Sequence, residues 1–232
     1  MTTKKAVIIM MNKKSIILLS GGLDSLVALG AFKDKYKIEL ALTFNYGQKT
    51  AKSEINASKK ICKYYKIKQE IINLDWLKNI TNTSLVSNNE IPTENLGTPE
   101  SAKNVWVPNR NGLFLNIAAC FADSYNYKYI IFGANKDEGE TFPDNTESFR
   151  KKISDTLKYS TLSKSKVIAP LINYTKNDIV RIAIEKRVPL ELVRSCYSSN
   201  HTHCGKCESC KHLKRALENN KANNYINILF GE

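Results

Sequence analysis

The feature that most constrains the fold is a glycine- and serine-rich hexapeptide between an apolar run and a helical pattern. The run spans 15–19, the hexapeptide is Ser20-Gly-Gly-Leu-Asp-Ser25, and apolar residues recur at helical spacing over 26–32. This order predicts a strand, a tight turn and a helix. Glycines let the backbone approach a ligand closely, and amide groups at a helix N-terminus attract phosphate. The hexapeptide therefore predicts a phosphate-binding loop rather than an ordinary glycine turn.

The rest of the chain continues this alternation of strands and helices. Strands are predicted over 38–44, 67–74, 128–133 and 167–171, and helices over 51–65, 112–123 and 179–186. Thr175 and Asp178 have the spacing of a capping box at the start of the last helix. Two polar, aperiodic segments are predicted to be a long loop or lid over 79–104 and an acidic loop over 135–150. The pattern predicts an α/β fold, with a Rossmann-like parallel sheet, helices on both faces and ligands at the carboxyl ends of the strands.

Four cysteines near the C-terminus are spaced Cys-x7-Cys-x2-Cys-x2-Cys. They are Cys196, Cys204, Cys207 and Cys210. The start of the chain lacks the features of a secretory signal, so disulfides are disfavoured and clustered thiols indicate a bound metal. Four thiolates match a closed, structural zinc site, with an iron–sulfur cluster, unligated thiols or a disulfide as alternatives. His201 and His203 are weaker candidates because four sulfurs fill the coordination shell, and Cys62 and Cys120 are interpreted as core residues of apolar helices.

Length and charge add limits to this interpretation. The 232 residues suit one domain of ordinary size with an appendage. We predict an N-terminal extension over 1–12, a nucleotide-binding domain over 13–187 and a zinc-binding region over 188–232. The formal net charge of +13 favours an anionic ligand such as ATP or RNA. No stretch has the roughly 20 apolar residues that cross a bilayer, so a membrane protein is excluded and a cytoplasmic location is expected.

The hexapeptide resembles the signature of the PP-loop ATP pyrophosphatases, and its combination with the cysteine spacing resembles the 7-cyano-7-deazaguanine synthase family. Other segments match that family in order: Asn45-Tyr-Gly-Gln48, Val107-Pro-Asn-Arg-Asn111, Pro143-Asp144, Val188-Pro-Leu-Glu-Leu192 and Ser195-Cys-Tyr197. The match runs from Lys14 to about Leu217. The resemblance implies a PP-loop ATPase fold, a C-terminal helical zinc-binding module and a homodimer.

The resemblance also implies a reaction. An ATP-dependent carbon–nitrogen ligase would adenylate the carboxylate of 7-carboxy-7-deazaguanine, form an amide with free ammonia and dehydrate it to 7-cyano-7-deazaguanine, in queuosine- or archaeosine-type biosynthesis. No nucleic acid is expected to be obligatory. The alternatives are a related deazaguanine amide-forming or conjugating enzyme, a PP-loop tRNA-modifying enzyme, and a non-catalytic zinc module that binds nucleic acid.

The residues that match the family's motifs form the candidate site. ATP is expected to contact Ser20, Gly21, Gly22, Leu23, Asp24 and Ser25, with Asp24 helping to place Mg²⁺. Substrate is expected to contact Gln48, Arg110, Asn111 and Asp144, and Asp24, Ser25 and Arg110 are the catalytic candidates. The planar guanidinium of Arg110 suits either a phosphate or a carboxylate. The surroundings of Pro143 depart from the family pattern, so Asp137, Glu138, Glu140 and Glu147 compete with Asp144 for the donor edge of the base.

Overall fold

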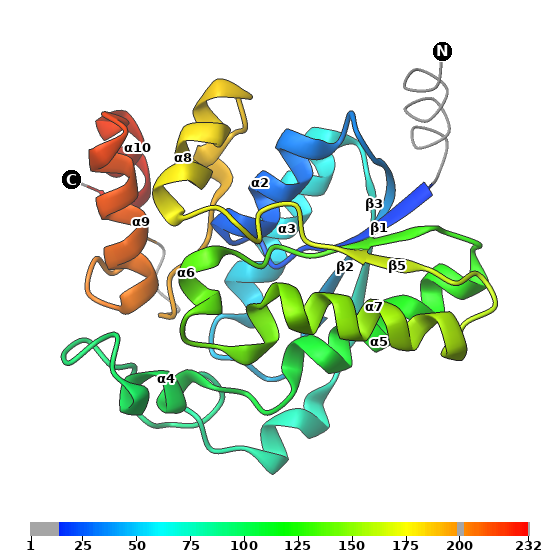
Figure 1. Cartoon of the computed structure of the whole chain (residues 1–232). Helices are drawn as coiled ribbons and strands as arrows, with labels where there is room; N and C mark the ends of the chain where they lie inside the picture. Colours follow the sequence, from blue (N-terminus) through cyan, green and yellow to red (C-terminus); the bar gives the residue numbers. More distant parts are fainter. Residues whose placement is uncertain (1–13, 199–201, 232) are drawn as a thin grey trace.

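A computed structural model describes residues 14–198 and 202–231, and its centre is a five-stranded parallel sheet (Figure 1). The strands are β1 (Lys14–Leu18), β2 (Lys37–Asn45), β3 (Lys68–Asn73), β4 (Tyr129–Ile131) and β5 (Lys166–Ile168), in the order β3-β2-β1-β4-β5. The predicted Rossmann-like α/β fold is confirmed, and the predicted strands are correct to within a few residues. The predicted extension over 1–12 and the candidate His201 lie outside the described residues.

Helices connect the strands and cover both faces of the sheet. The α-helices are α2 (Leu23–Phe32), α3 (Ala51–Tyr65), α4 (Pro99–Val105), α5 (Arg110–Ser124), α6 (Lys136–Gly139), α7 (Glu147–Ser160), α8 (Lys176–Glu185), α9 (Glu208–Asn219) and α10 (Asn223–Phe230), and the 3₁₀ turns are η1 (Asp75–Ile80), η2 (Pro143–Asn145) and η3 (Leu190–Leu192). The predicted capping box begins α8: the Thr175 hydroxyl accepts from the Asp178 N–H, and the Asp178 carboxylate accepts from the Thr175 N–H.

Two apolar cores lie on the two faces of the sheet. In Figure 1, α2, α3 and α8 lie on one side of the sheet, and α5 and α7 lie on the other. Adjacent residues of a strand point to opposite faces, so Ile16 packs in the core of α5 and α7 while Ile17 packs in the core of α2 and α8. Both side chains are fully buried, and each such burial contributes roughly 1.5–3 kcal/mol.

The strand order determines where a ligand can bind. The chain runs outward from β1 to β2 and β3, returns to β4 on the other side of β1, and continues to β5. The order therefore reverses between β1 and β4, and a crevice forms beyond the carboxyl ends of these two strands. The hexapeptide follows β1 at this position.

The C-terminal helices α9 and α10 pack beside α8, as Figure 1 shows. Leu213 and Leu217 of α9 and Leu229 of α10 belong to the same core as α2 and α8. The cysteine-containing region is therefore helical, as predicted, and it is continuous with the core that supports the hexapeptide.

The prediction of an acidic loop over 135–150 is wrong. This segment contains α6 and η2, and α7 begins at Glu147. The Thr146 hydroxyl caps α7 by accepting from the Phe149 N–H. Phe149, Ile153 and Leu157 then recur every four residues and pack on the core of α5. This apolar stripe is narrow and lies among charged residues, so the segment is polar in composition and its helical periodicity is weak.

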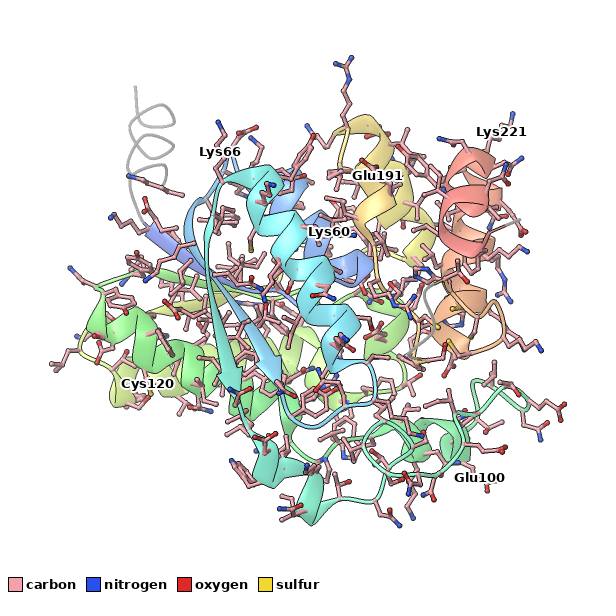
Figure 2. The ribbon with its side chains drawn as sticks, turned by 180° about the vertical axis from the view of Figure 1, so that it is seen from behind. Lys60, Lys66, Glu100, Cys120, Glu191 and Lys221 are labelled. Carbon is pink, nitrogen blue, oxygen red and sulfur yellow. The ribbon has the colours of Figure 1, made fainter. Side chains whose placement is uncertain are left out.

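Two other predictions need correction. The lid predicted over 79–104 is irregular for most of its length but ends in α4, which has a capping box between Thr98 and Ser101. Cys120 is exposed on the outside of α5 rather than in the core (Figure 2). Its thiol lies 3.4 Å from the carbonyl of Asn116, one turn earlier. Cys62 is buried, as predicted.

No helix in the described ranges is both long and apolar enough to cross a membrane.

Candidate active site and metal centre

The hexapeptide forms a compact turn that its own serines hold closed. The Ser25 hydroxyl donates to the Gly22 carbonyl (3.0 Å), the Gly22 N–H donates to the Ser20 hydroxyl (3.2 Å), and the two hydroxyl oxygens lie 3.2 Å apart. Gly22 precedes α2 and provides no side-chain cap. The Leu23 N–H donates to the Ser195 hydroxyl (3.2 Å), so the amide groups that follow it in the first turn of α2 are the ones suited to a bound anion.

Two glycines allow the turn to lie where it does. Gly21 has a φ of +87°, and a Cβ at this position would lie 2.9 Å from the Cβ of Ala57 in α3. Gly133 follows β4, and its Cβ would lie 2.8 Å from the backbone of Asp24 and of Ser25. A side chain at either position would displace the turn. Gly21 thus packs against α3, whereas the other five hexapeptide residues line a cavity.

This cavity lies beyond the carboxyl ends of β1 and β4, at the reversal of strand order. It brings the hexapeptide together with three of the four predicted substrate residues, Gln48, Arg110 and Asn111. It also contains Lys176 and Ser195, which were not predicted to belong to the site. Lys176 follows the capping threonine of α8, and Ser195 lies in a family-matching segment. No local pattern indicated that either side chain reaches the loop.

Asp24, Lys176 and Glu138 form a charged group on the cavity wall. Lys176 Nζ lies 2.5 Å from Asp24 Oδ2 and 2.8 Å from Glu138 Oε1. The side chains of Asp24 and Lys176 are 17% and 13% exposed. The second oxygen of Asp24, Oδ1, is buried and has no hydrogen-bond partner among the described residues. An unpaired carboxylate oxygen at this position fits a divalent cation.

The protonation of this group follows from burial and from charge. Burial raises the pKa of Asp24 to about 6, although attraction by Lys176 opposes the rise. Burial alone would lower the pKa of Lys176, but the two carboxylates outweigh it and keep this pKa above its ordinary value. Burial also opposes ionisation of Glu138, but Lys176 lowers its pKa overall. Asp24 is therefore the member of the group that binds a proton first as pH falls.

Arg110 is the first residue of α5 and lines the same cavity. Asn109 before it has a φ of 51°, a left-handed conformation that asparagine tolerates. The Arg110 guanidinium donates to the Tyr46 hydroxyl (3.1 Å) and lies 5.7 Å from the centre of that ring. Burial raises the pKa of Tyr46, so its hydroxyl is a neutral acceptor. Guanidinium has five N–H donors, so others remain for an anion.

Gln48 and Asn111 also line the cavity. The Gln48 amide is engaged within the protein: Oε1 accepts from the Tyr46 N–H (2.9 Å), and Nε2 donates to the Phe44 carbonyl (3.1 Å) and to Glu54 (3.0 Å). Gln48 therefore holds the turn after β2.

Asp144 is buried and is not among the residues that line the cavity, whereas its neighbour Asn145 is. The Asn145 amide donates to the Asp144 carboxylate (3.0 Å). Burial raises the pKa of Asp144, while the nearby charge of Arg110 opposes this rise. Of the acidic competitors, Glu138 lines the cavity.

The four predicted cysteine ligands come together at the start of α9. Their Sγ atoms all lie within 4.8 Å of one another. Four sulfurs at about 2.3 Å from a tetrahedral zinc ion would lie about 3.8 Å apart, and the Sγ atoms of Cys204 and Cys210 are separated by 3.9 Å. The N–H groups of Ser198 and Cys204 donate to Cys196 Sγ at 3.3 Å. The cluster therefore fits a metal held by four thiolates.

His203 does not belong to this ligand set. Its Nε2 accepts from the Ser195 N–H (3.1 Å), and its Nδ1 lies 3.1 Å from the Leu229 carbonyl. It is a buried histidine whose two nitrogens are both used in hydrogen bonds.

A parallel sheet whose order reverses beside β1, with a glycine- and serine-rich turn at that point, defines an α/β protein with the PP-loop ATPase fold. Solved structures share this fold. NMN synthetase from Francisella tularensis superposes with a TM-score of 0.51 at 16% identity, covering 98% of this chain and 91% of that chain. A 4-thiouridine synthetase, in an RNA complex with bound ATP, superposes with a TM-score of 0.51 at 18% identity, covering 93% of this chain and 52% of that chain.

Sequence comparison narrows the class to one family. The family described as "Queuosine biosynthesis protein QueC" matches residues 14–221. A 7-cyano-7-deazaguanine synthase from Carboxydothermus hydrogenoformans is 48% identical over 90% of this chain and 100% of its own length. One from Methanosarcina barkeri is 46% identical over 89% of this chain and 94% of its own length. The chain belongs to the QueC family, which confirms the predicted resemblance.

Proposed function

We propose that this protein is a 7-cyano-7-deazaguanine synthase, an ATP-dependent carbon–nitrogen ligase that converts 7-carboxy-7-deazaguanine and ammonia to the nitrile. The observation that carries the proposal is one cavity that joins the phosphate-binding hexapeptide to Arg110 and Asn111. The names of its relatives, which are 46–48% identical, support the same activity. The proposal assigns 13–187 to the nucleotide-binding domain and 188–232 to the zinc-binding region.

ATP is proposed to bind with its β- and γ-phosphates at the hexapeptide. Amide groups of α2 and the hydroxyls of Ser20 and Ser25 would contact the phosphate oxygens, and Asp24 Oδ1 would face Mg²⁺. Negative charge grows on pyrophosphate as it leaves, so donors fixed beforehand stabilise the transition state more than the bound substrate. Lys176 holds Asp24 Oδ2 in place, which leaves Oδ1 for the cation.

The reaction is proposed to consume two ATP molecules. A carboxylate oxygen attacks the α-phosphorus, the bond to the β-phosphate oxygen breaks, and pyrophosphate leaves. Ammonia then displaces AMP from the carbonyl carbon and loses a proton to give the amide. The amide oxygen attacks the α-phosphorus of a second ATP, with pyrophosphate leaving again, and loss of AMP and of both protons on the amide nitrogen gives the nitrile. Each carboxylate oxygen therefore leaves on a separate AMP.

The substrate is proposed to lie between the hexapeptide and Arg110. The guanidinium would hold the carboxylate or a phosphate, since a planar fork suits both anions. Asp144 remains the proposed acceptor for the donor edge of the base, with Glu138 as its competitor because Glu138 lines the cavity. We further propose zinc at the four cysteines, free ammonia as the nitrogen donor, a homodimer, a cytoplasmic location and no requirement for nucleic acid.

The test is incubation with 7-carboxy-7-deazaguanine labelled with ¹⁸O in both carboxylate oxygens, together with ammonia and MgATP. We expect 7-cyano-7-deazaguanine and two singly labelled AMP molecules for each nitrile, measured by mass spectrometry. Amide as the final product, with one labelled AMP, would instead identify an amide-forming enzyme. Product that forms only when tRNA is supplied would contradict the proposal in favour of a tRNA-modifying enzyme.

A further inference from the structure

The cysteine region contacts the hexapeptide directly through the segment 194–196. The Arg194 N–H donates to the Gly21 carbonyl (2.8 Å), and the Ser195 hydroxyl accepts from the Leu23 N–H (3.2 Å). Cys196, the next residue, is one of the four clustered thiols. Three consecutive residues thus connect the candidate metal site to the candidate phosphate site.

Ser195 is also positioned to contact a ligand itself. It lines the cavity, and the amide that it accepts from belongs to the first residue of α2. A serine hydroxyl has one proton to donate as well as lone pairs to accept. Within the described ranges Ser195 Oγ accepts this bond and donates none, so its proton is suited to a phosphate oxygen at the helix N-terminus.

The position of Ser195 depends on the cysteine region from both sides. On one side its own N–H donates to His203 Nε2 (3.1 Å). The His203 Nδ1 lies 3.1 Å from the Leu229 carbonyl, which can only accept, so the proton of the ring lies on Nδ1 and Nε2 is the acceptor. On the other side Ser195 is bonded to Cys196. Cys196 is itself a cluster cysteine, and His203 directly precedes another, Cys204, so both anchors of Ser195 belong to the cysteine region.

We propose that Ser195 is an ATP-site residue supplied by the cysteine region, and that zinc at the four thiols and MgATP at the hexapeptide strengthen each other's binding through the segment 194–196. This inference rests on the proposed use of ATP at the hexapeptide. Coupling between two binding sites is reciprocal, so MgATP must tighten zinc binding by the same factor if zinc tightens MgATP binding. Loss of zinc frees Cys196 and the segment that MgATP holds, so we also expect MgATP to slow that loss.

The first test measures MgATP affinity by calorimetry in zinc-loaded protein. Ser195→Ala removes both the acceptor for Leu23 and the proposed donor to phosphate, so we expect the Kd for MgATP to rise about tenfold with zinc content unchanged. Ser148→Ala, at an exposed serine of α7 outside the cavity, is the matched control and should leave the Kd unchanged. A Kd for Ser195→Ala within twofold of the unmodified protein would overturn the assignment.

The second test measures how fast a colorimetric chelator captures zinc from the same proteins. We expect saturating MgATP to slow capture about tenfold in the unmodified protein. Ser195→Ala should release zinc at the unmodified rate without nucleotide but should lose most of the slowing by MgATP. Equal capture rates with and without MgATP in the unmodified protein would overturn the coupling.

These outcomes separate the two proposals. If the unmodified, zinc-loaded protein binds no MgATP, the proposed function fails. The other case is that the unmodified protein binds MgATP, Ser195→Ala binds it equally well, and MgATP does not change the rate of zinc capture. Only the role of Ser195 and the coupling between the two sites are then wrong.

Discussion

The two oxygens of the Asp24 carboxylate have different surroundings, and this difference decides which substitution tests its role. Oδ2 is bonded to Lys176, whereas Oδ1 has no partner among the described residues. Asp24→Ala would remove both oxygens and leave the buried lysine with Glu138 alone. Asp24→Asn keeps the shape and removes the charge, so it is the cleaner substitution.

We expect Asp24→Asn to lower ATP-dependent turnover by roughly 10²–10³-fold, because it removes the charge proposed to face the cation at the phosphates. Turnover is measured as pyrophosphate release, and circular dichroism checks the fold. Asp34→Asn, in an exposed ion pair with Lys33, is the control and should retain full activity. Unchanged turnover in folded Asp24→Asn would contradict the proposed role.

The raised pKa of Asp24 gives a prediction for pH. Its pKa is about 6, so we expect MgATP affinity to fall as pH decreases through 6, because protonation removes the charge. Calorimetry between pH 5 and 8 on the unmodified protein and on Asp24→Asn measures this, since titration of the nucleotide is common to both. The difference in MgATP affinity between the two proteins should become smaller below pH 6.

Protonation of Asp24 should not lower the stability of the fold over this pH range. A carboxyl group whose pKa in the folded state lies above its ordinary value binds a proton more tightly when folded, so this group stabilises the fold as pH falls from above 6 toward 3.8. Loss of MgATP binding together with a constant or higher unfolding temperature is therefore the expected signature. If the difference in MgATP affinity between the unmodified protein and Asp24→Asn did not change between pH 5 and 8, the proposed protonation of Asp24 would be refuted.

At the scale of elements, the helix α9 begins at the cysteine cluster that is proposed to bind zinc. Cys207 is its N-cap residue and Cys210 lies in its first turn. We expect one zinc ion per chain, and we expect Cys207→Ser to lose it, since metal binding is coupled to folding. Each 1 kcal/mol of stability lost with the metal would lower the unfolding temperature by roughly 2–4 °C. Elemental analysis and calorimetric unfolding measure both effects.

Cys120→Ser is the control for this prediction, because Cys120 is exposed and remote from the cluster (Figure 2). It should keep both zinc and stability. Iron and sulfide in place of zinc would contradict the metal assignment and revive the tRNA-modifying alternative.

The helix α7 offers a second prediction at this scale. Leu157 is 1% exposed and packs in the core of α5, whereas Tyr159 on the same helix is 92% exposed. We expect Leu157→Ala to lower the free energy of unfolding by about 2–5 kcal/mol and Tyr159→Ala to change it by less than about 0.5 kcal/mol. Denaturant unfolding measures both. Similar losses in the two variants would show that α7 does not pack as described.

The sequence predicts well those features that residues close together in the chain determine. The capping box of α8, the hexapeptide turn and the spacing of the thiols are all local patterns. The narrow stripe of α7 was missed because charged residues separate its three apolar positions. The contacts of Lys176 with Asp24 and Glu138 join three distant parts of the chain, and only the folded sheet brings them together.

At the scale of the whole molecule, the net charge of +13 bears on nucleic acids. We expect any RNA binding to be weak, independent of sequence and lost as salt rises from 50 to 200 mM, because scattered lysines make simple phosphate contacts. Turnover of the free base should not change when tRNA is added. Filter binding over a salt series and product analysis measure the two effects. Tight binding to one tRNA at 200 mM salt would be inconsistent with this expectation.

The order of the sheet also has a consequence for synthesis on the ribosome. β1 pairs with β2 on one side and with β4 on the other, and Ser15 of β1 lies beside Tyr129 of β4. At roughly 5–20 residues per second, on the order of ten seconds pass between translation of these two strands. During that interval the central strand of the finished sheet is an edge strand with unpaired backbone groups, open to pairing with another nascent chain. This partly formed sheet is therefore the species that a chaperone would bind. It is also the species that could pair with the nascent chain of a second ribosome on the same message.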